Sequence, residues 1–301
     1  MNLDNDKLAP RGHMGKTILF ESKKDQEDFY KDFHSKSTMI AKFSSWNYQG
    51  NYNTSNVNFE KLIVEEIIEK NLIKEKDFQK YDYKLEKMHL CLNSSKKELD
   101  ESEQNKVSVS FYETSSKLKE IYADFIEKVI SPLFDEEIYF QVVPTFRFHF
   151  PNQKGYEWSD RYHTDVMLGH PPYEFNIWVP FTGTYESNSM RLTSYDDSMS
   201  ILNDNNFNFE IFSKNVQYDE ILKKKLKDKS ESLKMNYGEF IIFDPRCLHC
   251  TQHNITEDTR ISMDTRIILK SKLKKYSREY RTTGRKKMPF TPGHYFSKKS
   301  I

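Results

Sequence analysis

The chain has 301 residues, enough for one large domain or two small ones. With 30% charged residues, a mean hydropathy of −0.81 and no long apolar run, the sequence excludes a transmembrane segment and shows no secretory signal. A net charge of +1 gives no general basis for nucleic-acid binding. The three cysteines, without a signal peptide, predict a protein of the reducing cytoplasm.

Helical spacing dominates the first part of the chain, residues 1–135. Apolar residues recur at helical intervals in Phe59–Ile73 and in Tyr112–Phe134, and Pro132 marks the end of the second segment. Residues 74–103 are charged and show no clear pattern. We also expect a polar tail up to about Thr17, a helix within Ile18–Phe33 and a loop over Ser45–Asn58.

The pattern then changes to the two-residue period of β-strands. Apolar and polar residues alternate in Phe140–Phe150, Glu174–Phe181 and Arg260–Ile268, and Phe240–Phe243 reads as a short apolar strand. The apolar face of such strands can pack under helices while the polar face looks into an enclosed space. We therefore predict a mostly β protein with α-helices. It would be a barrel or jelly roll lined by a polar site and buttressed by the N-terminal helices, in one domain spanning residues 1–301.

Two polar segments border the predicted core, which spans residues 136–270. Ser187–Tyr237 is expected to be irregular apart from a short helix around Tyr218–Lys227, and such long insertions often form a lid or a substrate wall. Residues 271–301 form a basic tail, which is by default a solvated terminus. The alternative for this tail is a phosphate-binding cover for a nucleotide-linked or phosphorylated substrate.

His163 and Asp165 are candidate metal ligands. One residue separates them on a segment expected to begin a strand, so their side chains would point to the same face. His249 could join them, because neighbouring strands bring distant segments together. Two imidazoles and one carboxylate with open positions are the ligand set of non-haem Fe(II) oxygenases. The alternative for an isolated His-x-Asp is an imidazole hydrogen-bonded to a nearby carboxylate on a sheet.

Arg260 begins the strand that follows His249, and Ser262 and Arg266 share its face. A guanidinium beside a hydroxyl, deep in a barrel, can bind a carboxylate of a small dicarboxylate through two parallel hydrogen bonds. The alternative for Arg260 is a structural ion pair, for example with Asp264. The ordered combination of all these positions is far less expected by chance than any one of them.

This ordered set, His163-x-Asp165, His249 and Arg260-x-Ser262, resembles the Fe(II)/2-oxoglutarate-dependent dioxygenases. The longer text, from His163 through His170-Pro-Pro to Asn176-Ile-Trp178-Val-Pro180, is similar to the phytanoyl-CoA-hydroxylase-like branch. Within that branch it resembles oxygenases encoded in antibiotic and surface-carbohydrate gene clusters, such as the streptomycin cluster. The resemblance covers about residues 140–269 and leaves out the N-terminal helices and the basic tail.

The resemblance implies a double-stranded β-helix, a cupin-like jelly roll, that holds Fe(II) by His163, Asp165 and His249. 2-Oxoglutarate would chelate the iron and place its distal carboxylate on Arg260 with help from Ser262, and O2 would take the remaining position. Decarboxylation of 2-oxoglutarate to succinate would accompany oxidation of an unactivated C–H bond. Related halogenases lack the carboxylate ligand, so the presence of Asp165 favours hydroxylation or another C–H oxidation.

Other residues of the polar strand faces are candidates for contacts with cosubstrate or substrate. Asn176 could hydrogen-bond the cosubstrate and Trp178 could wall the pocket; alternatively, both belong to the core. Arg147 and His149 could meet an anionic or hydroxylated substrate, or pair with Glu174. The residues predicted to contact substrate are Arg147, Trp178, His170 and Arg266.

The expected substrate is a small polar molecule, and the resemblance points to a sugar, a sugar-nucleotide or a natural-product intermediate. Two alternatives stay open. One is a protein or nucleic-acid hydroxylase that docks through the basic tail, and the other is a cupin-like barrel that binds a metal or ligand without turnover. Cys247-Leu-His-Cys250 looks like half a zinc motif, but the chain has no second cysteine pair.

Overall fold

The computed structural model describes most of the chain between residues 18 and 298. The predicted polar tail and most of the basic tail lie outside the described residues. The described ranges are 18–19, 23–35, 46–99, 104–153, 160–168, 170–273, 281–282 and 295–298.

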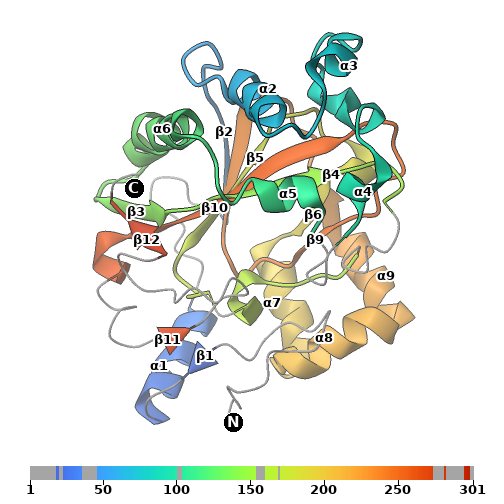
Figure 1. The fold of residues 1–301 in the computed structure, drawn as a ribbon. Coiled ribbons are helices and arrows are strands. Elements are labelled where there is room, and N and C mark those ends of the chain that lie inside the picture. Colours follow the sequence, from blue (N-terminus) through green and yellow to red (C-terminus); the bar gives the residue numbers. More distant parts are fainter. Residues whose placement is uncertain are drawn as a thin grey trace.

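A seven-stranded antiparallel sheet lies at the centre of the molecule (Figure 1). Its strands are β2 (Asn47–Asn51), β3 (Ile138–Gln141), β4 (Thr145–His149), β5 (Phe175–Pro180), β8 (Glu239–Phe243), β10 (Arg260–Leu269) and β12 (Phe296–Ser297). The order is β12-β3-β10-β5-β8-β2, and β4 also pairs with β10. The long strand β10 is thus the common partner of β3, β4 and β5.

The predicted strands appear with two differences. The expected strand Phe140–Phe150 is interrupted after Gln141, and its two parts pair with successive stretches of β10. Strand β2 forms inside Ser45–Asn58, which was expected to be a loop. Its polar sequence lacks the apolar alternation of a strand because β2 lies at the edge of the sheet, where it pairs only with β8.

A second, three-stranded antiparallel sheet consists of β6 (Met190–Thr193), β7 (Ser230–Ser232) and β9 (His249–Thr251), in the order β7-β6-β9. The segment around His163 extends this small sheet by one isolated antiparallel bridge to His249. A buried apolar cluster joins the two sheets. It contains Trp178, Ile241 and Phe243 of the large sheet and Met190 and Leu192 of the small one.

Helices precede and follow the strands. Their bounds are α1 (Lys23–His34), α2 (Phe59–Glu69), α3 (Glu75–Gln79), α4 (Ser94–Lys97), α5 (Lys106–Ser110), α6 (Ser116–Phe125), α7 (Tyr195–Asp204), α8 (Phe209–Tyr218) and α9 (Glu220–Lys229). The predicted helix Tyr112–Phe134 starts at the Ser115 cap, continues as a π-helical turn over Ile126–Ile130 and ends in a 3₁₀ turn that contains Pro132.

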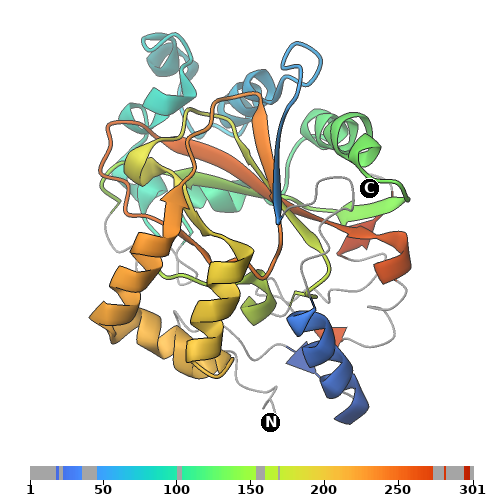
Figure 2. The ribbon, with the colours of Figure 1, turned by 180° about the vertical axis from the view of Figure 1, so that it is seen from behind.

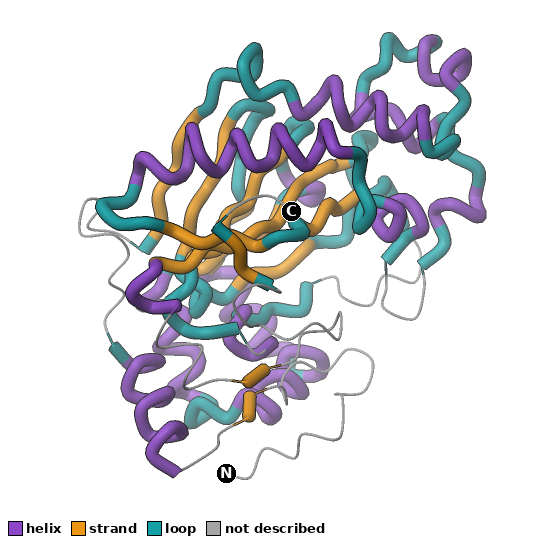
Figure 3. Tube along the Cα trace, turned by 60° about the vertical axis from the view of Figure 1, so that its left-hand side comes forward, coloured by secondary structure: helices purple, strands orange, loops and turns teal. Residues whose placement is uncertain are grey.

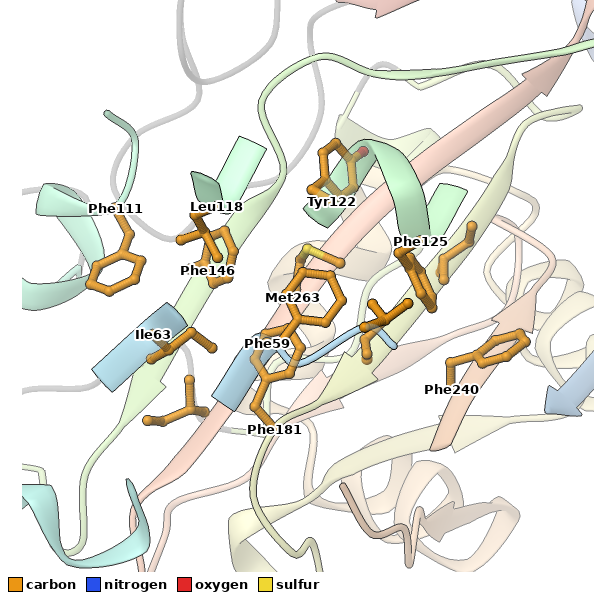
Figure 4. Close-up of a cluster of buried hydrophobic side chains, with 14 of the residues drawn as sticks. Phe59, Ile63, Phe111, Leu118, Tyr122, Phe125, Phe146, Phe181, Phe240 and Met263 are labelled. Carbon is orange, nitrogen blue, oxygen red and sulfur yellow. The ribbon is translucent and has the colours of Figure 1, made fainter. Parts of the chain in front are cut away.

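The helices α2 and α6 cover one face of the large sheet (Figure 3). Apolar side chains from both helices, including Phe59 and Phe125, pack there against Phe146 and Met263 of the sheet and Phe181, which directly follows β5 (Figure 4). This packing agrees with the prediction that the apolar strand faces lie under N-terminal helices. The opposite face of the sheet therefore carries the polar residues and lies between the two sheets.

The segment Ser187–Tyr237 is more ordered than the sequence suggested. It contains β6, β7 and three helices, α7, α8 and α9, which lie together at one end of the molecule (Figure 2). The side chains of Ser194, Asn208 and Asp219 cap these helices. The sequence predicts only α9, as the short helix around Tyr218–Lys227, because the apolar stripes of α7 and α8 are short and interrupted by polar residues. None of the helices within the described ranges is long and apolar enough to cross a membrane.

Candidate metal centre

Two chain segments bring the candidate ligands together. His163 and His249 form a reciprocal backbone pair, in which each N–H donates to the other carbonyl at 3.0 and 2.9 Å. Asp165 begins a 3₁₀ helix, Asp165–Leu168, and its N–H donates to the Pro245 carbonyl at 3.0 Å. The expected strand at His163 is thus only one bridge long, and the turn that follows it, rather than strand alternation, directs the Asp165 carboxylate toward both imidazoles.

The three side chains offer their ligand atoms to one point. The donor atoms of His163, Asp165 and His249 lie within 4.8 Å of one another, and His249 Nε2 is 3.6 Å from Asp165 Oδ1. The two imidazole rings have centroids 4.4 Å apart. Asp165 and His249 are buried, and His163 is partly buried. This arrangement suits one metal ion with ligands on one side and open positions on the other.

Backbone carbonyls orient both imidazoles. His163 Nδ1 lies 3.0 Å from the Arg161 carbonyl oxygen, and His249 Nδ1 lies 3.0 Å from the Cys247 carbonyl oxygen. A carbonyl oxygen only accepts, so each Nδ1 carries the proton and each Nε2 carries the lone pair. Such hydrogen bonds set the tautomer and the ring orientation of metal-binding histidines.

The electrostatics favour the metal-binding protonation states of His163 and Asp165. Burial and the neighbouring His249 lower the pKa of His163 to about 3. Burial alone would raise the pKa of Asp165, but Arg266 and the surrounding imidazoles outweigh it and lower that pKa far below its usual range. A neutral imidazole and an ionised carboxylate are the forms that a cation requires.

The predicted cosubstrate residues lie on the polar face of the large sheet. Arg260 is paired in register with His149, and Ser262 with Arg147. Arg260 is buried, with its guanidinium carbon 6.0 Å from the centre of the Trp178 ring. Among the described residues, neither Ser262 Oγ nor Asn176 Oδ1 has a hydrogen-bond partner, although both are buried. Buried polar atoms of this kind are consistent with a bound water, an ion or a polar ligand beside them.

The remaining candidates have partners within the protein. Arg147 forms an ion pair with Asp264. This pair differs from both alternatives stated from the sequence, which were Arg147 with Glu174 and Arg260 with Asp264. His170 Nδ1 lies 2.8 Å from Glu174 Oε1. Burial and the nearby Arg260 lower the pKa of His149, which favours a neutral imidazole. Cys247 and Cys250 are buried thiols outside any disulfide, and neither belongs to a group of potential metal ligands in the described part of the chain.

Arg266 contacts a ligand residue. Its guanidinium donates to Oδ2 of Asp165, a candidate metal ligand, on the side of the carboxylate away from His249. Sequence alternation correctly placed Arg266 on the polar face but gave no information about its partner. Asp165, His170 and Glu174 also lie within 4.8 Å of one another, and the ion pairs of Arg266 with the two carboxylates account for this second cluster.

The chain is similar to a curated protein and to several solved structures. No family model matches the chain. The streptomycin biosynthesis protein StrG of Streptomyces griseus is 27% identical over 187 residues, which are 62% of this chain and 72% of StrG.

Solved structures of non-haem iron enzymes also resemble the chain. The apo form of EctD from S. alaskensis matches with a TM-score of 0.46 and 12% identity, over 88% of this chain and 83% of EctD. The 2-oxoglutarate-dependent carbocyclase SnoK of nogalamycin biosynthesis matches with a TM-score of 0.36 and 10% identity, over 82% and 83%. A nickel complex of the non-haem monooxygenase ThoJ matches with a TM-score of 0.34 and 16% identity, over 52% of this chain and 54% of ThoJ.

Proposed function

We propose that the chain is an Fe(II)- and 2-oxoglutarate-dependent oxygenase. The observation that carries this proposal is the group of two imidazoles and one carboxylate, His163, Asp165 and His249, whose donor atoms lie within 4.8 Å. This donor set fits iron(II), because a facial triad leaves positions for a chelating cosubstrate and for O2. When bound, iron, 2-oxoglutarate and O2 supply the oxidising chemistry, with loss of CO2 and formation of succinate.

The protein residues have distinct proposed roles around the metal. Arg260, with Ser262, binds the distal carboxylate of 2-oxoglutarate, and Asn176 offers its amide to the same ligand. Support comes from the burial of all three side chains and, among the described residues, from the Ser262 hydroxyl, which has no hydrogen-bond partner and can donate to a carboxylate. A guanidinium in a water-poor setting binds a carboxylate more strongly than at the surface.

The two antiparallel sheets are proposed to be the halves of a double-stranded β-helix in one domain. Side chains from both sheets share the apolar cluster around Trp178, and the ligands His163 and His249 lie on the small sheet. The site would therefore lie between the sheets, while the helices stay outside. That location excludes bulk water from the oxidation, which limits side reactions.

The proposed substrate is a small polar molecule, such as a sugar or a natural-product intermediate. The similarity to StrG, a streptomycin biosynthesis protein, supports this substrate class. The ion pair of Arg147 with Asp264 also supports it, because this pair lies on the polar sheet face and the Arg147 side chain is 40% exposed. The carboxylate of Asp165 occupies the ligand position that a halide would need, so the proposed outcome is hydroxylation or another C–H oxidation.

An anaerobic titration tests the cofactor assignment. Metal-free protein is mixed with Fe(II) and then with increasing 2-oxoglutarate, while the weak visible charge-transfer band of the chelate is recorded. We expect the band in the wild type and in Arg191→Ala, which removes a guanidinium bonded to Tyr162 and Ser230 instead. In Arg260→Ala the band should require at least about tenfold more 2-oxoglutarate, because a charge-assisted bidentate contact is lost.

Turnover gives a second, independent check. Succinate formation from 2-oxoglutarate should disappear in His163→Ala and in Asp165→Ala, because each change removes a ligand of the proposed triad. Full succinate formation by both variants would contradict the proposal. Iron binding without the band in the wild type would instead indicate a metal site of another kind.

A further inference from the structure

We infer that Arg266 is a positioning residue of the metal centre, which makes Asp165 present a single carboxylate oxygen to the ion. The inference rests on the proposed function, because it concerns how a proposed ligand meets the metal. It differs from the sequence-based expectation that Arg266 contacts substrate. Three observations support this role: the contacts of both Asp165 oxygens, the fixed position of Arg266 and the number of open positions on the metal.

The two oxygens of Asp165 have different surroundings. Arg266 Nε and Nη2 both lie close to Oδ2, at 2.7 and 2.6 Å. The other oxygen, Oδ1, faces His249 Nε2 at 3.6 Å, on the side where the imidazoles converge. One oxygen is therefore bound by a guanidinium, and the other is directed to the metal position.

Arg266 is itself held in place. Its Nη1 donates to Gln141 Oε1 at 3.1 Å and to the Tyr295 hydroxyl at 3.4 Å, and its Nε is 3.5 Å from Glu174 Oε1. Glu174 is in turn 2.8 Å from His170. The Arg266 side chain is only 11% exposed. A planar guanidinium with partners on several sides has little freedom to turn away, so it can hold the carboxylate in one orientation.

The orientation matters because a carboxylate can bind a metal through one oxygen or through both. In an octahedral facial triad, three positions remain for other ligands. 2-Oxoglutarate needs two of them as a chelator, and O2 needs the third. A second oxygen of Asp165 would take one of these positions. By holding Oδ2, Arg266 keeps the full set of positions available.

Metal affinity alone does not test this role. Removing the positive charge of Arg266 would by itself favour a nearby cation, whereas losing the fixed orientation would disfavour it. The two effects oppose each other. The number of water molecules on the metal is a better measurement, because it reports directly how many positions the protein ligands occupy.

The experiment uses Mn(II) as a paramagnetic probe, with the full chain and without cosubstrate. Water-proton relaxation enhancement of the protein–Mn(II) complex is measured for the wild type, Arg266→Met and Arg266→Lys. In Arg266→Met, Asp165 should bind through both oxygens and displace one of three waters, so the enhancement should fall to about two thirds of the wild-type value. Arg266→Lys keeps one charged donor and should restore most of the enhancement.

Two further proteins control for loss of stability. Arg266→Met removes the cation that pairs with Glu174 and leaves this buried carboxylate near Asp165. The double variant Arg266→Met, Glu174→Gln is therefore also prepared, because it has one buried negative charge less. Glu66→Ala breaks the contacts of a buried carboxylate with Ser115 and Lys70 in the outer helical layer. It should weaken folding without changing the enhancement.

The outcomes separate this inference from the proposed function. If Arg266→Met or its double variant binds Mn(II) with the same enhancement as the wild type, the positioning role is wrong while the metal centre stands. An equal fall in Glu66→Ala would also overturn the role, because general destabilisation would then explain the change. If the wild type does not bind Mn(II) and shows no iron–cosubstrate band, the proposed function itself is wrong.

Discussion

The two imidazoles of the site are oriented by the same local arrangement. In each case the ring Nδ1 faces the carbonyl of the residue two positions earlier, Arg161 for His163 and Cys247 for His249. Because the two segments also form a reciprocal backbone pair, the ring centroids lie 4.4 Å apart, with the ring planes tilted by 52°. The orientation of the two imidazoles therefore follows from backbone pairing and from these carbonyl contacts.

The buried imidazole of His149 should make the free energy of unfolding depend on pH. Burial, Arg260, His253 and Arg147 lower its pKa well below the ordinary value of 6.5. Below about pH 6.5, His149 binds a proton in the unfolded chain but not in the folded chain. The contribution of His149 to stability is therefore present above that pH and is lost as the pH falls. The loss should approach about 1.4 kcal/mol per pH unit.

Urea unfolding of metal-free protein at a series of pH values measures this effect. The wild type should lose stability more steeply than His149→Gln between about pH 6.5 and about pH 5, because glutamine does not titrate. Other buried imidazoles contribute equally to both proteins and cancel in the comparison. Parallel pH profiles for the two proteins would contradict the assignment of a neutral, buried His149.

Residue spacing predicted which side chains approach the proposed site, but not all of their partners. The types and order of His163, Asp165 and His249 predicted their convergence, although a turn and not strand alternation directs Asp165 to the two imidazoles. The ion pairs of Arg147 and Arg266 were not predictable, because a strand pattern gives the face of a residue and not the neighbour across the sheet. Those neighbours depend on the register of β10 with β4 and β5.

The edge strand β2 shows how an element can form without a clear sequence signal. Its sequence Asn-Tyr-Gln-Gly-Asn has no apolar alternation, yet all five residues pair with β8. Gly50 explains part of the fit. A Cβ atom at this position would lie 2.5 Å from Cζ of Phe240, whose ring belongs to the buried core. The absent side chain thus lets the strand approach the core ring.

Gly50→Ala tests this contact. The added methyl group would force the Phe240 ring or the β2 backbone to move, so we expect a loss of about 1–3 kcal/mol in the free energy of unfolding. Gly183→Ala is the matched control, because a Cβ there meets nothing within 4 Å. The control should leave stability unchanged or raise it slightly. Equal effects of the two substitutions in urea unfolding would contradict the packing argument.

Elements with strong periodicity were easier to predict than short capped helices. The alternating strands and the apolar stripes of α2 and α6 follow directly from the residue pattern. The helices α7 and α8 did not, whereas α9 corresponds to the short helix expected around Tyr218–Lys227. All three helices are short. Their formation depends on side-chain caps and on packing into a second core cluster that includes Phe212 and Leu226.

At the scale of the whole molecule, one turn connects the proposed site to the N-terminal helix α1. Arg246 pairs with Asp244 at 2.7 Å and donates to the carbonyls of Phe33 and Ser35 at the end of α1, at 3.0 and 2.8 Å. The same turn supplies the Pro245 carbonyl to Asp165 and the Cys247 carbonyl to His249. The ligands are thus supported by parts of the chain that are distant in sequence.

Metal binding should therefore stabilise the whole fold. An ion that bridges the 163–165 segment and His249 binds the folded chain and not the unfolded one, because unfolding separates the ligands. At a free Fe(II) concentration of about 100 times Kd, the free energy of unfolding should rise by about 2.7 kcal/mol. Anaerobic urea unfolding of the wild type, with and without Fe(II), measures the change. Asp165→Asn, which keeps the side-chain size but loses the charge, should show little of it. Equal stabilisation of this variant would mean that the ion binds elsewhere and that the three side chains do not form the metal centre.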